Sequence, residues 1–368
     1  MTDSTFTVVV ATPDVVGERM AGPGIRAWHL ARELARHVPT TLIAKLEDFK
    51  GGDVRAVDRG SMEAEEALTR AGVLIGQPAR GFRRRRRSQR LVMDLFDPLV
   101  LELRELYGSA PSFRQRIHLA AEWSRLTYAL RRGDLLISAT AKQREFYDRL
   151  RSSDAPWIEV PFGVDLGEVR PCKPSHDNLV VWGGGLWEWL DPRTAVDAVL
   201  QTNRSGLRCN LLFLGGSRPN RDIVDRRRQS RLAQLVDAGG PYVSANAEWV
   251  PYRERLSWLR SGKIAIMLHR STEEAEYAIR TRLFDAIAAA VPVVVTERGF
   301  AAELVKTEKI GLVVPPGDSG AVAAALRRLL TDDDFHAGCV ENLERIRPRY
   351  SWSVVTRPLI DAVMQWQT

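Results

Sequence analysis

The 368-residue sequence contains few cysteines and no long apolar run. Its three cysteines, Cys172, Cys209 and Cys339, are too far apart to form a metal-binding or redox CxxC pair, and their odd number suits a reducing compartment. The longest apolar run, residues 286–295, contains Pro292 and is far shorter than the roughly 20 residues that a membrane-spanning helix needs. These shortages exclude a disulfide-stapled scaffold and a membrane-spanning helix.

The sequence is also poor in lysine and has no basic amino terminus. Only 7 of its 53 basic residues are lysines, and the first ten residues, MTDSTFTVVV, contain an acid and no base, which predicts no secretory signal. A cytoplasmic location is expected, either free or at the inner face of a membrane. The composition, with 45% hydrophobic and 27% charged residues, is that of a folded globular protein, and the net charge of +7 favours anionic partners.

Short β-branched runs alternate with stretches of helical periodicity along both halves of the chain. In the first half, strands are expected at 6–10, 41–44, 73–75, 91–93 and 135–138, with a helix from Gly24 that Pro39 ends. In the second half, strands are expected at 179–182, 211–214, 264–268 and 293–296 and one ending near Trp249, with helices at 194–200 and 223–236 and from Tyr252 and Arg280. This alternation predicts two doubly wound, Rossmann-like α/β domains.

Four prolines between residues 156 and 174 interrupt the periodicity and indicate a linker near 165–176. The predicted domains are therefore 1–170 and 171–350, and residues 351–368 are expected to form a helix that packs back toward the first domain. Sheets of this kind bind ligands beyond the carboxyl ends of their strands. We expect the two sheets to face a cleft.

Glycines follow the first predicted strand of the chain. Gly17, Gly22 and Gly24 do not fit the spacing GxGxxG, which disfavours a dinucleotide fold. Arg26 comes two residues later, so the start of this helix is either an anion site, built from backbone amides and Arg26, or a plain tight turn.

A second glycine loop follows the first strand of the second half. Gly183, Gly184 and Gly185 leave room for a ligand close to the backbone, and Gly215 repeats the arrangement one strand later. Trp187 either stacks on a base or sugar or packs against the next helix.

The richest cluster of charged residues surrounds the predicted helix from Arg280. His269 and Arg270 end a strand, and an acidic loop with Glu274 and Glu276 follows. Arg282 and Asp285 are three residues apart and share a helix face. They predict either a clamp, with the guanidinium on a diphosphate and the carboxylate on a ribose diol, or an ordinary ion pair.

The sequence resembles the retaining, GT-B-fold glycosyltransferases of glycosyltransferase family 4 (group 1) over nearly its whole length. The matching segments, in order, are GPGIRAWHLARELA, VMDLFDP, GDLLISATAKQREFY, VPFGVD, VWGGGLWEWLDP, FLGGSRPN, WVPYRER, RTRLFDAIAAAVPVVVTERG and GLVVPPGD. The resemblance implies that Asp285 holds the donor ribose. It also implies that Glu274 or Glu276 replaces a displaced first acid, and that Arg280 and Arg282 replace the family's missing Arg and Lys pair on the diphosphate.

On the acceptor side, the candidates are Asp94 and Asp97 in VMDLFDP, although Asp97 before Pro98 is also a helix-start signal. The candidate catalytic residues are Asp94, Asp97, Glu274 and His269. The candidate donor-binding residues are Gly22, Gly24, Arg26, Gly183, Gly184, Gly185, Trp187, Gly215, Arg270, Glu276, Arg280, Arg282 and Asp285. The run Arg83–Arg87 is either a solvated loop or an attachment to an anionic membrane, and no nucleic acid is expected.

The function that the resemblance implies is transfer of a hexosyl or deoxyhexosyl group, with retention, from a nucleotide diphosphate donor to a glycan or lipid-linked acceptor. Such a reaction would serve the synthesis of a cell-surface polysaccharide or glycolipid. No metal and no cofactor is expected. The alternatives are a nucleotide-sugar epimerase of similar build and a non-catalytic basic protein that binds membranes or nucleic acid.

Overall fold

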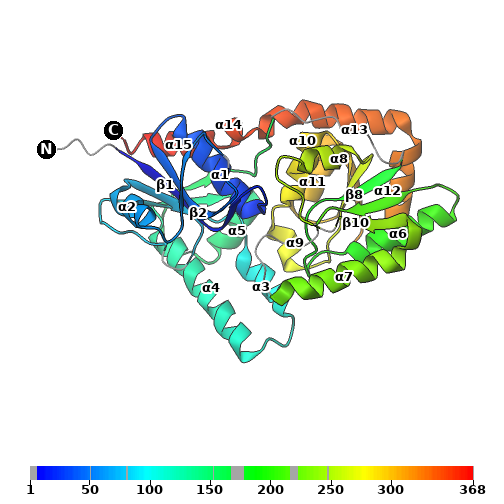
Figure 1. Cartoon of the computed structure of the whole chain (residues 1–368), viewed down its shortest axis with the longest axis horizontal. Coiled ribbons are helices and arrows are strands. Elements are labelled where there is room, and N and C mark those ends of the chain that lie inside the picture. Colours follow the sequence, from blue (N-terminus) through cyan, green and yellow to red (C-terminus); the bar gives the residue numbers. More distant parts are fainter. Residues whose placement is uncertain are drawn as a thin grey trace. The chain divides into compact units, whose positions relative to one another are not determined.

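The computed structural model describes residues 6–49, 51–79, 82–151, 153–166, 178–215, 223–246 and 248–367. The chain forms two compact units (Figure 1). Unit 1 consists of Met1–Gly163 together with Trp352–Thr368, and unit 2 consists of Val164–Ser351. Each unit contains one parallel sheet with helices between its strands.

Unit 1 has a seven-stranded sheet of order β3-β2-β1-β4-β5-β6-β7. The strands are β1 (Val8–Gly17), β2 (Thr40–Glu47), β3 (Arg55–Asp58), β4 (Val73–Gly76), β5 (Arg90–Asp94), β6 (Leu135–Ser138) and β7 (Trp157–Glu159). β4 and β6 are buried along their whole length, as expected for strands that helices cover on both faces. The strand order reverses beside β1, which makes its carboxyl end a natural binding position.

The helices of unit 1 are α1 (Gly22–Ala35), α2 (Met62–Arg70), α3 (Leu99–Tyr107), α4 (Phe113–Arg132), α5 (Ala141–Asp148), α14 (Trp352–Val355) and α15 (Arg357–Met364). The hydroxyls of Ser61, Ser112 and Thr140 cap α2, α4 and α5 by accepting hydrogen bonds from backbone amides of the first turn. The last two helices return the chain to unit 1. Trp352 stacks on His29 with ring centroids 4.7 Å apart, and a β-carbon at Gly163 would lie 2.3 Å from this indole.

Unit 2 has a six-stranded sheet of order β10-β9-β8-β11-β12-β13. The strands are β8 (Leu179–Trp182), β9 (Asn210–Phe213), β10 (Val243–Ala245), β11 (Ile264–Met267), β12 (Val293–Thr296) and β13 (Gly311–Val314). The helices are α6 (Pro192–Arg204), α7 (Ile223–Gly239), α8 (Arg255–Arg260), α9 (Glu273–Tyr277), α10 (Thr281–Ala289), α11 (Gly299–Glu308), α12 (Ser319–Thr331) and α13 (Asp333–Ile346). Short 3-10 turns occupy Gly240–Tyr242 and Arg347–Tyr350.

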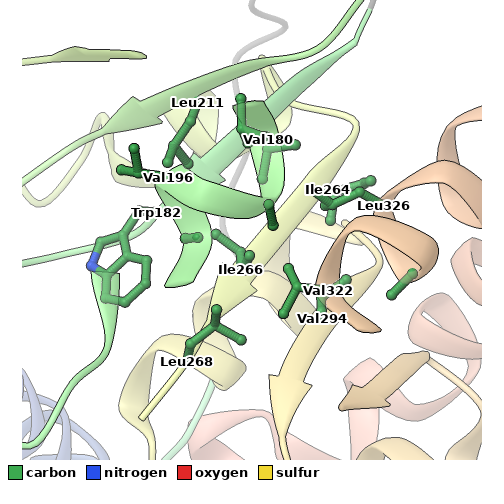
Figure 2. Packing of buried hydrophobic residues seen from close by; sticks show 14 of the residues in the cluster. Val180, Trp182, Val196, Leu211, Ile264, Ile266, Leu268, Val294, Val322 and Leu326 are labelled. Carbon is green, nitrogen blue, oxygen red and sulfur yellow. The ribbon is translucent and has the colours of Figure 1, made fainter. Parts of the chain in front are cut away.

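The core of unit 2 holds its glycine loops on a rigid base. Figure 2 shows Val180 and Trp182 of β8 packed with Ile264 and Ile266 of β11 and with Val322 of α12. All five side chains are fully buried. Trp182, at the carboxyl end of β8, is the last core side chain before the glycines begin.

The structure confirms the fold class of two doubly wound parallel α/β sheets. The expected strands at 135–138, 179–182 and 293–296 have the observed bounds. The strand expected to end near Trp249 is wrong, because β10 ends at Ala245 and Trp249 makes only an isolated bridge with Gly215. β1 also continues to Gly17 through a register shift after Ala11, where the sequence predicts a loop.

Candidate functional site

The glycine loops at the carboxyl edge of the unit 2 sheet pack backbone against backbone. A β-carbon at Gly215, after β9, would lie 2.2 Å from the carbonyl oxygen of Gly184, after β8. Gly184 itself has φ +72°, which a residue with a side chain rarely adopts. The glycines are thus required for the close approach of two loops, and this approach leaves their backbone at the sheet edge.

Arg282 reaches this edge from the first turn of α10. Its Nη2 donates a hydrogen bond to the carbonyl of Gly185, and its guanidinium carbon lies 5.7 Å from the ring centroid of Trp182. Nη1 is buried and has no hydrogen-bond partner among the residues that the structure describes. Burial, and next the neighbouring charge of Arg280, lower the pKa of Arg282 to about 9. An anion placed here would relieve both effects.

Asp285 does not pair with Arg282, so the predicted intrahelical ion pair is absent. Instead Arg255 of α8 donates from Nε to Oδ1 of Asp285 at 2.9 Å. Arg255 also donates from Nη1 to the carbonyl of Tyr252 at 2.8 Å and stacks over the Tyr252 ring at 3.7 Å. The nearby Asp285 carboxylate raises the pKa of Arg255 against the effect of its burial. Sequence reasoning missed Arg255, although it lies in the matching segment WVPYRER.

Glu274 and Arg280, two of the predicted site residues, form a buried ion pair with each other. Nη1 and Nη2 of Arg280 each donate to one carboxylate oxygen of Glu274 at 2.7 Å, and Glu274 is fully buried. Both oxygens of Glu274 are occupied by this pair. Arg280 uses one N–H of each terminal nitrogen in it, and its Nε has no partner among the described residues. The reason for the pairing is local: Arg280 precedes α10 in extended conformation and turns back toward α9.

His269 follows β11 and is held as a neutral ring. Its backbone N–H donates to Oγ1 of Thr296 at 3.0 Å, and its Nδ1 lies 3.1 Å from the carbonyl of Arg270. Because a carbonyl only accepts, Nδ1 carries the proton and Nε2 is the acceptor of the ring. Burial, and next the charge of Arg280, lower the pKa of His269 to about 4. Arg270 is exposed beside it, and Glu276 is half-buried on α9.

This histidine predicts a loss of stability in acid. A histidine in the unfolded chain has a pKa of about 6.5. Between pH 6.5 and 4, His269 therefore binds a proton in the unfolded chain but stays neutral in the folded protein. Stability should fall as the pH drops through this window, by about 2 kcal/mol at pH 4.5. Urea unfolding of wild type and His269→Gln at pH 7.5 and 4.5 measures the difference. His37 is exposed, so His37→Gln is the matched control. If His269→Gln lost as much unfolding free energy between pH 7.5 and 4.5 as wild type does, the buried neutral state of His269 would not be the cause.

Trp187 packs rather than standing free. Its ring stacks on Trp189 at 5.6 Å with an interplanar angle of 3°, and it contacts the core of unit 2. Trp189 is buried. Of the two roles that the sequence allows for Trp187, packing or stacking on a base or sugar, the structure shows packing on the side that faces Trp189.

In unit 1, the predicted anion site at the start of α1 is filled by a carboxylate of the protein. Arg26 is fully buried and donates from Nε and Nη2 to the two oxygens of Asp94 at 2.7 and 2.9 Å. Its Nη1 donates to the carbonyl of Pro161 at 3.0 Å. Arg26 thus uses three of its five N–H donors within unit 1 and is fully buried, so it is not exposed to a ligand phosphate. Both oxygens of Asp94 accept hydrogen bonds from Arg26.

The glycines at this helix start serve packing. Gly22 is the first residue of α1, and a β-carbon at Gly24 would lie 2.1 Å from the carbonyl oxygen of Val15. A small cavity at the carboxyl ends of β4 and β5, beside the middle of β1, is lined by Thr12 and Asp94, among others. Asp97 is half-buried and is not the cap of α3, because that helix begins at Leu99 after Pro98. Burial raises the pKa of the neighbouring Tyr147, and the charge of Asp97 adds to the effect.

The arginine run 83–87 is tied to its unit rather than freely solvated. Arg84 pairs with Asp134, and Arg85 lies 3.7 Å from Glu65. The buried Gln89 accepts hydrogen bonds from the amides of Arg85 and Arg86 at 2.6 and 2.8 Å. Two of the five charges are thereby offset by carboxylates of unit 1.

Within the described ranges, no helix is long and apolar enough to cross a membrane. Among the same residues, no group of three or more His, Cys, Asp or Glu side chains is placed to hold a metal ion. Cys209 and Cys339 are buried free thiols, and Cys172 lies outside the described residues. At the edge of unit 2 the groups that can meet a ligand are therefore arginine donors, backbone amides, one neutral imidazole and Asp285.

Comparisons with known proteins agree with this arrangement. Residues 178–332 match the family model described as Glycosyl transferases group 1. No curated protein sequence matches the chain. Among solved structures, sucrose-phosphate synthase from Thermosynechococcus elongatus has a TM-score of 0.72 at 17% identity and covers 98% of both chains. HepE from Anabaena, in complex with UDP-glucose, has a TM-score of 0.71 at 14% identity over 98% of this chain and 99% of its own.

A third similar structure is WaaG, a glycosyltransferase involved in lipopolysaccharide biosynthesis, with a TM-score of 0.69 at 14% identity over 97% of this chain and 99% of its own. These likenesses show the GT-B fold, and they do not favour the epimerase or the non-catalytic protein. The matched segment covers β8 to α12, which includes both glycine loops and Arg282. Unit 2 thus carries a group 1 glycosyl transferase domain, and the chain is an enzyme of the glycosyltransferase class.

Proposed function

We propose that the enzyme transfers a sugar, with retention, from a nucleoside diphosphate donor bound by unit 2 to a glycan or lipid-linked acceptor. The observation that carries the donor class is the buried Nη1 of Arg282, which has no partner within the described ranges, on a guanidinium that contacts the glycine loop after β8. Among the described residues, Nε of Arg280 and Nε1 of Trp182 are also buried without a partner. All three atoms are donors, which supports a ligand that accepts hydrogen bonds, as a diphosphate does.

Asp285 supplies the complementary group for the nucleoside. Arg255 contacts Oδ1, and this contact fixes the carboxylate in place. A carboxylate accepts from two neighbouring hydroxyls, which is the arrangement that a ribose diol presents. HepE, a protein of the same fold, was solved with UDP-glucose. A uridine or other nucleoside diphosphate sugar is accordingly the donor class to test.

Retention is proposed from the state of the carboxylates at this edge. A double-displacement mechanism needs a free carboxylate as nucleophile. Glu274 is fully buried and paired on both oxygens, and Asp285 is held by Arg255. Assistance by the departing phosphate on the same face of the sugar needs only positioned donors, which Arg282 and the loop amides provide. The neutral His269, with Nε2 as acceptor, is suited to hold a sugar hydroxyl.

Asp285→Asn is expected to weaken donor binding about tenfold, since a hydrogen bond to a charged group is worth roughly 1.5 to 3 kcal/mol and the amide keeps part of it. Calorimetric titration with UDP-, GDP- and dTDP-sugars measures the affinity and ranks the bases. Asp197→Asn is the matched control, because Asp197 also pairs with an arginine, Arg193, at 3.0 Å, within α6 and away from the glycine loops. Equal affinity in wild type and Asp285→Asn would remove Asp285 from the donor site.

A further inference from the structure

Two carboxylates of α9 and α10 are held by arginines in different ways. Glu274 of α9 is fully buried, and Arg280 donates to both of its oxygens at 2.7 Å. Asp285 of α10 accepts at Oδ1 from Nε of Arg255, 2.9 Å away, and its side chain is 25% exposed. The first pair is closed, whereas the second leaves a held carboxylate within reach of a ligand.

Arg255, the first residue of α8, is itself held on two further sides. Its Nη1 donates to the carbonyl of Tyr252 at 2.8 Å, and its guanidinium carbon lies 3.7 Å from the centroid of the Tyr252 ring. Tyr252 is buried, and its hydroxyl donates a long hydrogen bond, of 3.4 Å, to Oδ2 of Asp165. A guanidinium that is both stacked and hydrogen-bonded has a fixed plane. The orientation of the Asp285 carboxylate is therefore set from α8.

The same two helices are joined a second time at their carboxyl ends. Arg260, the last residue of α8, donates from Nε to the carbonyl of Ala289, the last residue of α10, at 3.1 Å. Arg260 thus joins α8 to the backbone of α10, whereas Arg255 joins it to the side chain of Asp285. Of these two contacts, the second is the one that orients a group of the candidate site.

We propose that Arg255, supported by Tyr252, is a positioning residue that directs Asp285 at the ribose diol of the donor and so gives the site a preference for ribonucleotides over 2′-deoxyribonucleotides. This inference rests on the proposed function, in which Asp285 accepts from the ribose hydroxyls. A carboxylate that turns freely can exchange a lost hydroxyl for water. A carboxylate that is fixed against the diol keeps an oxygen without its donor when the 2′ hydroxyl is missing.

Calorimetric titration of the full chain with UDP and 2′-deoxy-UDP, and with the matching guanosine pair, measures this preference. Wild type should bind the ribonucleotide about tenfold or more tightly, as expected for one hydrogen bond to a charged group. Arg255→Met should lower the ratio to about threefold or less, because the carboxylate is no longer fixed. Arg255→Lys and Tyr252→Leu, which remove the planar fork and the stacked ring, should give intermediate ratios. Arg260→Met is the matched control and should keep the wild-type ratio.

A double-mutant cycle distinguishes positioning from a general structural role. Arg255→Met should weaken ribonucleotide binding about tenfold in the wild-type background but by less than about twofold in the Asp285→Ala background, because it acts through that carboxylate. A reduced folded fraction would change the stoichiometry of the titration and not these ratios.

Three results would overturn the inference. They are an equal loss in both backgrounds of the cycle, a wild-type preference retained in Arg255→Met, and no preference for ribonucleotides in wild type. Unchanged ribonucleotide affinity in Asp285→Ala would instead show that the ribose contact of the proposed function is wrong. If Asp285→Ala loses affinity while Arg255→Met does not, the proposed function stands and Arg255 has no positioning role.

Discussion

Replacing Arg282 by methionine is expected to lower the affinity for a nucleoside diphosphate sugar by about 10- to 150-fold without destabilising the ligand-free protein. The loss corresponds to one charge-assisted hydrogen bond to phosphate, worth roughly 1.5 to 3 kcal/mol. The stability should be retained or rise, because Arg282 is a partly buried cation whose Nη1 has no partner in the described part of the chain and whose charge is repelled by Arg280. Calorimetric titration and the melting temperature together measure both effects.

Arg282→Lys separates the charge from the planar fork. It should lose most of the affinity as well, because lysine cannot contact both the Gly185 carbonyl and a phosphate in one plane. Arg260→Met is the matched control. Arg260, the last residue of α8, donates from Nε to the carbonyl of Ala289 at 3.1 Å, and Ala289 is at the end of α10 away from Arg282. Wild-type affinity in Arg282→Met, accompanied by a lower melting temperature, would show a purely structural arginine and would also remove the main support for the proposed donor site.

The second large effect is expected in unit 1. Asp94→Asn should lower the free energy of unfolding by about 3 to 5 kcal/mol, because it leaves the fully buried Arg26 guanidinium without a counter-charge. Urea unfolding followed by tryptophan fluorescence measures the change. The exposed Asp148, which pairs with Arg144 at 3.3 Å, provides a matched variant, Asp148→Asn, with an expected cost of about 1 kcal/mol or less.

A double variant distinguishes this structural role from a catalytic one. Arg26→Met combined with Asp94→Leu removes both charges and should recover most of the stability that Asp94→Asn loses. If turnover then stays at the wild-type level, Asp94 acts only by positioning α1 against β5. Equal unfolding energies for Asp94→Asn and Asp148→Asn would contradict the buried-pair interpretation.

The fold follows from the sequence because its strands are buried on both faces. Such a strand has an unbroken run of β-branched or other apolar residues, such as 179–182 or 293–296. It can therefore be located from the sequence alone. The missed strands lie mostly at sheet edges. β3 has one buried residue in four and β7 none in three, so their sequences carry no such signal.

The pairings of the candidate site residues could not be predicted from the sequence. The sequence places an anion site near Arg26, and the structure supplies the anion from Asp94, which is 68 residues away. Arg280 and Arg282 look equivalent in sequence. The start of α10 at Thr281 separates them, since it sends Arg280 to Glu274 and Arg282 to the carbonyl of Gly185, 97 residues distant. Local spacing contains no information on such long-range partners.

The return of the last helices to unit 1 also has a consequence for how the protein is made. The Trp352 ring covers His29 and fills the space that Gly163 leaves, so unit 1 lacks this contact until the whole of unit 2 has been synthesised. At about 5 to 20 residues per second, translation of that intervening segment takes on the order of 10 to 40 s. During this interval the nascent first unit lacks the contact between Trp352 and His29, whereas the second unit is contiguous in sequence.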